Sequence, residues 1–272
     1  CSALEAAGIG NLIRTKLIKH HFTLFLNIAV SISASCFIYA ALLKIAEMAF
    51  NVPSIHEAGY ICSMLFIIPG FPFITSGIDL AKLDLRSGLE RLAYAIIIVM
   101  VATMFAWIMA LLLRLQPMDF EDLNLTPVLH LILRLIMSFF GVFGFSIMFN
   151  SPAPMAATAA LIGAIANSLR LELVDLTGMP APAAAFAGAL TAGLLASFIK
   201  ENNGYPRISL TVPSIVIMVP GLYLYRAIYN FGIMALSDAV SWFASAIMII
   251  IALPLGLIFA RILTDKTFRY CT

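Results

Sequence analysis

Charged residues are scarce in this sequence. Only 11% of its 272 residues are Asp, Glu, Lys or Arg, whereas about a quarter of a soluble globular domain is charged. Hydrophobic residues make up 62% of the chain, and they form runs of about 20 residues, the length that crosses roughly 30 Å of hydrocarbon. The composition excludes a soluble domain and predicts an all-α polytopic membrane protein.

Residues that build catalytic or metal sites are equally few. The four cysteines, Cys1, Cys36, Cys62 and Cys271, have neither C-x-x-C nor metal-ligand spacing, and the four histidines do not cluster. The sequence contains no P-loop, no nucleophile elbow and no His-Glu-x-x-His motif. We therefore expect neither an enzyme nor a metal site, and neither a cofactor nor a nucleic-acid partner.

The apolar runs predict about eight membrane helices. These cover residues 22–43, 57–77, 88–114, 128–149, 152–170, 180–199, 208–229 and 239–262. The longest connection, residues 114–127, carries Asp119, Glu121 and Asp122. Residues 1–20 are typical of the tail of another helix. Because the chain begins at Cys1, we expect a fragment that lacks its natural N-terminus.

Basic residues are unequally divided between the two sides of these helices. One side holds Arg14, Lys16, Lys19, Lys82, Arg86, Arg91, Lys200, Arg207, Arg261, Lys266 and Arg269. The other side holds only Lys44, Arg114, Arg134, Arg170 and Arg226. Cytoplasmic loops are enriched in Lys and Arg. The bias therefore predicts that the first side, which includes the C-terminus, is cytoplasmic.

Two of the predicted helices are interrupted by a proline followed by a glycine. Pro69-Gly70 and Pro220-Gly221 lie 151 residues apart, and the same shift aligns the Ala- and Ile-rich starts of the helices that follow them. Five helix steps separate the two breaks, so the two broken helices should run in opposite directions. We predict two inverted repeats, residues 1–115 and residues 128–272, and the first is incomplete at its N-terminus.

A break of this kind has two interpretations. Proline removes a backbone donor and clashes with the preceding turn, so each break is either a packing kink or an opening for a ligand. In lipid the freed backbone groups survive only against protein or a wet cavity, and paired broken helices are typical of substrate sites in transporters. The matched positions favour a substrate site at Pro69, Gly70, Pro220 and Gly221.

Two charged side chains follow the first break. Asp79 is a candidate for coupling to a proton or cation, because carboxylates at membrane depth are costly and usually functional. The alternative is an ordinary ion pair with Lys82 or Arg91 at a helix end. Arg91 is either a cytoplasmic anchor or a fork that binds a carboxylate.

The second half holds further polar candidates. Asn150 precedes a proline in a tight turn between two helices. Asn167 and Arg170 lie at the far end of the predicted helix 152–170, where Arg170 either reaches the interface or attracts an anionic substrate. Tyr225 and Arg226 follow the second break and are candidates for a gate.

These motifs resemble a known family. Pro69-Gly70-Phe71-Pro72, Asp79, Ser87-Gly88 and Arg91 resemble the first membrane half of the threonine/serine exporter family. The second half of that family is similar to Phe149-Asn150-x-Pro152, Gly163, Asn167-Ser168-x-Arg170, Tyr205-Pro206-Arg207, Val219-Pro220-Gly221 and Tyr225. The family includes two-subunit dicarboxylate (succinate) exporters, in which the halves are separate chains. The chain differs from the family pattern at Thr75, where an asparagine is usual.

The resemblance implies a bacterial inner-membrane exporter of small hydrophilic metabolites, either threonine and serine or a dicarboxylate such as succinate, driven by a proton or cation gradient. Family members have five helices per half and an N-terminal extramembrane region. The first half of this chain has only three predicted helices and part of a fourth, without such a region, and this departure agrees with the expected truncation. The substrate-binding candidates are Pro69, Gly70, Thr75, Asn150, Asn167, Pro220, Gly221 and Tyr225. Asp79 is the coupling candidate, and Arg91, Arg170 and Arg226 are candidates for anion attraction or gating. The alternative is a non-transporting membrane scaffold or partner subunit, and a homo-oligomer is one assembly that the sequence allows.

Overall fold

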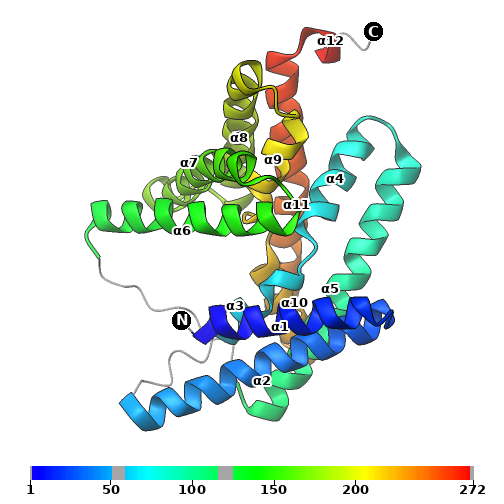
Figure 1. The fold of residues 1–272 in the computed structure, drawn as a ribbon, viewed down its shortest axis with the longest axis vertical. Coiled ribbons are helices and arrows are strands. Elements are labelled where there is room, and N and C mark those ends of the chain that lie inside the picture. Colours follow the sequence, from blue (N-terminus) through cyan, green and yellow to red (C-terminus); the bar gives the residue numbers. More distant parts are fainter. Residues whose placement is uncertain (1, 51–58, 116–124, 270–272) are drawn as a thin grey trace. The chain divides into compact units, whose positions relative to one another are not determined.

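A computed structural model describes residues 2–50, 59–115 and 125–269 (Figure 1). The described residues form helices joined by short connections, with no strand among them. This confirms the predicted all-α class. The predicted first residues of the helix 57–77 and the acidic residues Asp119, Glu121 and Asp122 lie outside the described residues.

Six helices are long and apolar enough to cross a membrane: α2 (Leu24–Phe50), α5 (Leu85–Leu113), α6 (Pro127–Met148), α7 (Ala153–Thr177), α8 (Ala181–Asn203) and α11 (Leu236–Thr264). Two further spans are bent. The first joins α3 (Gly59–Met64) and the 3₁₀ turn η2 (Leu65–Ile67) to α4 (Gly70–Ala81) with a bend of 55°, and the second joins α9 (Arg207–Val216) to α10 (Gly221–Gly232) with a bend of 44°. Counted as single spans, they bring the described total to eight, as predicted. Two other helices, α1 (Ser2–Lys19) and α12 (Lys266–Arg269), lie near the ends of the described chain.

Two helices end seven residues later than predicted. The helix predicted to end at residue 43, α2, continues to Phe50. The sequence suggested an end at Arg170, but α7 continues to Thr177 and ends at Gly178, whose φ of 66° forms a left-handed C-cap. The last two turns of α7 carry Glu172 and Asp175. Both accept hydrogen bonds from Arg134 of α6, and this pairing lets the helix continue past them.

Elements of the second half repeat those of the first at a constant offset. The bounds of α10 and α11 each lie 151 residues beyond those of α4 and α5. The turns between these helices also match, because Leu83 and Met234 both have a left-handed backbone, with φ of 63° and 62°. The amide of Leu83 donates to Leu80 O at 3.0 Å, and the amide of Met234 donates to Phe231 O at 3.2 Å. The offset equals the spacing of the two Pro-Gly pairs.

The chain forms two compact units, and each draws on both halves of the sequence. Unit 1 comprises residues 1–69, 94–123 and 221–244, and unit 2 comprises residues 70–93, 124–220 and 245–272. The chain passes between the units at both Pro-Gly pairs, and again within α5 and α11 after residues 93 and 244. These two pairs of crossing points have the same 151-residue spacing. Repeats in the sequence and compact units in space are therefore different divisions of this chain.

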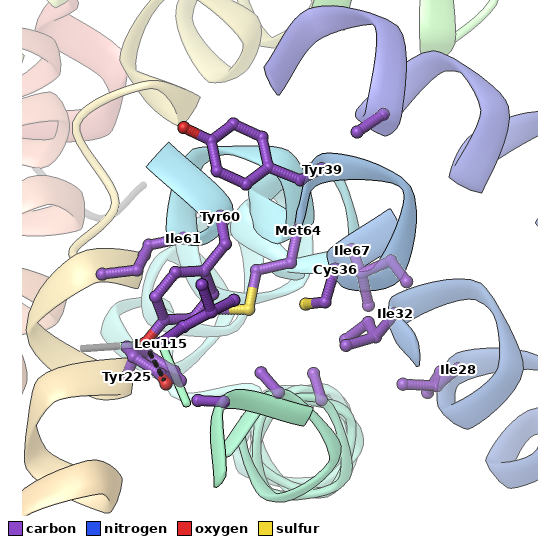
Figure 2. Packing of buried hydrophobic residues seen from close by; sticks show 14 of the residues in the cluster. Ile28, Ile32, Cys36, Tyr39, Tyr60, Ile61, Met64, Ile67, Leu115 and Tyr225 are labelled. Atoms are coloured by element: carbon purple, nitrogen blue, oxygen red, sulfur yellow. Dashed lines mark hydrogen bonds between the residues drawn. The ribbon is translucent and has the colours of Figure 1, made fainter. Parts of the chain in front are cut away.

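The core of unit 1 is an apolar cluster built on α2, α3 and α5 (Figure 2). Figure 2 shows Ile28, Ile32 and Cys36 along one face of α2, beside Met64 and Ile67 of the first broken helix. In this unit α1 lies along α2. Ser35 of α2 donates to Ala6 O at 3.1 Å and to Ser63 O at 2.6 Å, which ties α2 to both neighbours.

Unit 2 is packed through small residues. Helices α6 and α7 lie along one another, and α9 packs on α7. A Cβ atom added at Gly163 of α7 would lie 2.7 Å from Ser214 O of α9. Likewise a Cβ at Gly77 of α4 would lie 2.3 Å from the Pro254 ring of α11. Only glycine allows these approaches, which hold α9 and α4 against the rest of the unit.

Candidate functional site

Both Pro-Gly breaks have the same local hydrogen bonding. The amide of Ile68 donates to Leu65 O at 3.1 Å, and the amide of Val219 donates to Val216 O at 3.1 Å. Each helix thus tightens into one 3₁₀-type turn before its proline. A new helix then begins at the glycine, and the first four residues of a helix have no amide partner within it. In α4 the third of these residues is Pro72, which has no amide hydrogen. Each break therefore presents both freed carbonyls and freed amides.

In unit 2 four helices converge on the second break. A Cβ at Gly70, the first residue of α4, would lie 3.2 Å from side-chain atoms of both Val216 and Val219. Gly141 of α6 and Gly188 of α8 approach the side chains of Ile217 and Met218, at 3.6 and 3.3 Å by the same measure. The fourth helix, α7, reaches the break through Arg170. Residues 216–219 are thus enclosed by protein on several sides, as unpaired backbone in a membrane requires.

Arg170 contacts the broken backbone directly. Its Nη1 donates to Met218 O at 3.4 Å, and the side chain is partly buried. Because α7 extends to Thr177, Arg170 lies about two turns inside its helix and not at the helix end. The guanidinium therefore places a positive charge at the carbonyl end of a half-helix, where the helix dipole favours a cation.

Asn167 lies one turn before Arg170 on α7. Its Nδ2 donates to Ser138 Oγ of α6 at 2.9 Å. Among the described residues no hydrogen-bond partner reaches its Oδ1, nor the buried hydroxyls of Ser146 and Ser168. Unpaired buried polar atoms are costly, so water or a polar ligand is the expected partner along the α6–α7 interface.

Asn150 and Thr75 lie close to the start of α4, but they differ in exposure and in hydrogen bonding. Asn150 is exposed, with a left-handed φ of 58°, and its amide closes the turn on Ile147 O at 2.9 Å. Its neighbour Phe149 packs edge-on against Phe71, with ring centroids 5.1 Å apart. Thr75 is buried and donates to Phe71 O within its own helix, at 3.0 Å.

Asp79 pairs with Arg91, the partner that one of the sequence interpretations named. Arg91 Nη1 lies 3.1 Å from Asp79 Oδ2, and their side chains are 50% and 19% exposed. The pair closes the turn between α4 and α5 within unit 2. Asp79 lies nine residues beyond Gly70, so it is about 13 Å along the helix from the break.

In unit 1 the first break has a less polar environment. A Cβ at Gly221, the first residue of α10, would lie 2.9 Å from Leu65 and 3.2 Å from Ile68. This contact mirrors that of Gly70 in unit 2 at the 151-residue offset. Tyr225 is fully buried, and its hydroxyl lies 2.5 Å from that of Tyr60 (Figure 2).

Arg226 packs over an aromatic ring. Its Cζ lies 4.8 Å from the centroid of the Trp242 ring, and Tyr223 contacts the same ring edge-on at 5.1 Å. Trp242 lies 151 residues beyond Arg91. The two repeat-related hairpins are thus closed by different chemistry, an ion pair in unit 2 and a cation–π contact in unit 1.

The structure divides the predicted site residues between the units. Pro69, Gly221, Tyr225 and Arg226 belong to unit 1, and Gly70, Thr75, Asp79, Arg91, Asn150, Asn167, Arg170 and Pro220 belong to unit 2. Sequence reasoning did not find the partners Ser138, Met218, Tyr60 and Trp242. The 151-residue offset would have pointed to Trp242, because it aligns this residue with Arg91. No pattern in the sequence points to the other three.

Two family models match the chain. One, described as "Threonine/Serine exporter, ThrE", covers residues 134–263, and the other, described as "Putative threonine/serine exporter", covers residues 1–113. Comparison with curated proteins and with solved structures gave no significant match. Neither model covers residues 114–133, which comprise the connection between α5 and α6 and the first turns of α6. The sequence predicts one repeat to end and the next to begin in this connection.

Proposed function

Because this chain belongs to the threonine/serine exporter family, we propose that it is a secondary active exporter that works by alternating access. It is a multi-pass membrane protein, and its family indicates transport of amino acids. We place it in the bacterial cytoplasmic membrane with its C-terminus in the cytoplasm, because of its basic bias. The proposal assigns it the movement of a solute and no chemical reaction.

The observation that carries this proposal is the repetition of one local structure at two positions. At both breaks a 3₁₀-type turn precedes the proline, and the helix that follows has the same length. The turn after that helix has a residue with a left-handed backbone at the matching position, 151 residues apart. With five helix steps between them, the two copies run in opposite directions across the membrane. Exchange of conformations between inverted repeats is a recurrent way to alternate access from one side to the other.

Threonine and serine are the proposed substrates, and a dicarboxylate such as succinate is the second candidate. The freed amides that begin α4 and α10 suit a carboxylate, because helix N-termini bind anions. The 3₁₀ turns already pair Leu65 O and Val216 O, so the other carbonyl oxygens at the end of each half-helix before its proline are the ones that suit the ammonium group of an amino acid. Arg170 beside Met218 O supports the alternative, because a second carboxylate would need an extra cation.

Asp79 is the proposed coupling group. The Asp79 side chain is 19% exposed and pairs with Arg91, whose side chain is 50% exposed. Because water screens a half-exposed ion pair, the pair is weak, and protonation or cation binding at Asp79 would compete with it. A gradient that charges and discharges Asp79 would alter the turn that joins α4 to α5. Arg91 is then the partner released when Asp79 is neutralised.

Efflux of labelled threonine, serine and succinate from cells that produce the protein tests the proposal. Wild type is compared with Gly70→Leu, Gly221→Leu and the control Gly144→Leu, at equal protein level in the membrane. A Cβ at Gly70 or Gly221 already lies within 3.2 Å or 2.9 Å of its neighbours, whereas nothing lies within 4 Å of one at Gly144. We expect both break variants to abolish efflux of one substrate and the control to retain it. Equal efflux from all strains and from an empty control would favour a non-transporting partner subunit.

A further inference from the structure

Unit 2 contains a cavity that the proposed substrate path does not use. It has a volume of about 680 Å³ and lies among the ends of α4, α8, α9 and α11, beside α12. Part of its lining is apolar and comprises Ile78, Ile208, Leu257 and Ile258. Its size falls within the range of pockets that hold small ligands.

The polar lining of this cavity is strongly basic. Lys82, Arg207, Arg261 and Lys266 line it, against one carboxylate, Asp265. Asp265 pairs with Arg261 at 3.4 Å, and Arg261 also packs over the Phe268 ring at 4.1 Å. Four positive charges against one negative charge leave an excess of three. Like charges gathered around one cavity repel each other unless a counter-ion lies between them.

Arg207 is the best positioned of the four. It is partly buried, and its two terminal nitrogens donate to neutral acceptors, Thr264 Oγ1 at 2.9 Å and Gly193 O at 3.1 Å. Arg261 and Asp265 lie near enough to act on its charge with opposite signs. A guanidinium has five N–H donors, so donors remain for an anion while these two bonds fix its direction.

Among the described residues, the unit 1 positions that match the basic residues of the cavity carry no basic side chain, while the counterpart of Arg207, His56, lies outside the described residues. At the 151-residue offset, Ile233 takes the place of Lys82 and Ala110 that of Arg261. Tyr60 takes the place of Thr211, and its hydroxyl is bonded to Tyr225 in the apolar cluster. The positive charges of Lys82 and Arg261 are thus not repeated at the matching positions of unit 1.

We propose that this cavity binds an oxyanion, either the phosphate of an anionic lipid headgroup or a soluble phosphate or dicarboxylate. Arg207 binds the anion with charge-assisted hydrogen bonds, and the exposed Lys82 and Lys266 neutralise its remaining charge. The apolar lining residues accommodate the carbon chain of a lipid or of a dicarboxylate. Basic pockets between membrane helices on the cytoplasmic side are suited to anionic headgroups.

The test uses the purified full chain and measures binding without transport. Thermal stability is followed against inorganic phosphate and succinate at constant ionic strength, and native mass spectrometry counts phosphatidylglycerol and phosphatidylcholine retained from mixed micelles. The variants are Arg207→Gln and the exposed double variant Lys82→Gln/Lys266→Gln. The control is Arg86→Gln, because Arg86 is an exposed basic residue of the same unit that does not line the cavity.

We expect the wild type and Arg86→Gln to bind one of the two sources saturably. Arg207→Gln should weaken that binding at least about tenfold, the factor lost with one hydrogen bond to a charged group. Stabilisation by phosphate or succinate identifies a soluble ligand, and selective retention of phosphatidylglycerol identifies a lipid. The inference is overturned if both cavity variants respond to all three anions as the wild type does. Because no efflux is measured, this result is distinct from a failure of the proposed transport function.

Discussion

Replacing Gly163 by alanine should destabilise the protein, and the structure allows the size of the effect to be worked out. The new Cβ would lie 2.6 Å from Val142 Cγ2, 2.7 Å from Ser214 O and 3.1 Å from Ser214 Cα. Two of these three atoms belong to the backbone of α9, which cannot rotate away. Helices α7 and α9 would have to separate, and overpacking of this kind costs about 1–3 kcal/mol.

The matched control is Gly144→Ala in the neighbouring helix α6. Nothing lies within 4 Å of a Cβ at this position. Both replacements lie inside helices, so both gain about 0.8–1 kcal/mol from the higher helix propensity of alanine. That gain cancels in the comparison, and the difference between the variants is the overpacking cost alone.

The assay is thermal unfolding of the two purified variants in the same detergent at one scan rate. A difference of 1–3 kcal/mol corresponds to a melting temperature lower by roughly 2–12 °C for Gly163→Ala than for Gly144→Ala. If Gly163→Ala melts at the same temperature as Gly144→Ala, or above it, then the close approach of α7 to α9 does not limit stability. Our account of how unit 2 positions its broken helix would then be refuted.

Three other predictions follow from single contacts. Tyr60→Phe and Tyr225→Phe should each cost about 1–3 kcal/mol by leaving one buried hydroxyl unpaired, whereas the double variant should cost less than their sum in thermal unfolding; additive losses would contradict the bond. Asp79→Asn should change stability by less than about 1 kcal/mol, because Arg91 is half exposed, yet abolish gradient-driven efflux; unchanged efflux would exclude Asp79 from coupling. Arg134→Gln should lower stability by about 1–3 kcal/mol, because two acidic side chains of α7 lose their charged partner; an unchanged melting temperature would show that α7 does not need this pairing.

Periodicity and hydropathy predicted the membrane class and the helix positions because both depend on composition along one segment. The breaks were predictable for the same reason, since proline and glycine act on their own helix. Prediction failed at Arg170 because the true end of α7 depends on Arg134, a residue 36 positions earlier in the chain. The acidic residues near that end pair with Arg134, and local sequence does not specify this partner.

The partners of the polar candidates were harder to predict. Asp79 pairs with Arg91, only twelve residues away, and the sequence offered this pair as an alternative. Arg170 contacts the carbonyl of Met218, 48 residues away, and the main-chain carbonyl of a methionine leaves no trace in a sequence pattern. The placement of Tyr225 against Tyr60 likewise depends on packing between segments 165 residues apart.

The exchange of segments between the two compact units bears on how the chain is made and divided. Unit 1 needs residues 221–244 and unit 2 needs residues 70–93, so neither can be completed from one half of the chain. During synthesis, the helices of unit 1 that are made first cannot complete their packing until residues 221–244 have been synthesised. A gene cut between the halves would yield two polypeptides that need each other in equal amounts, because each would carry a piece of the other's core.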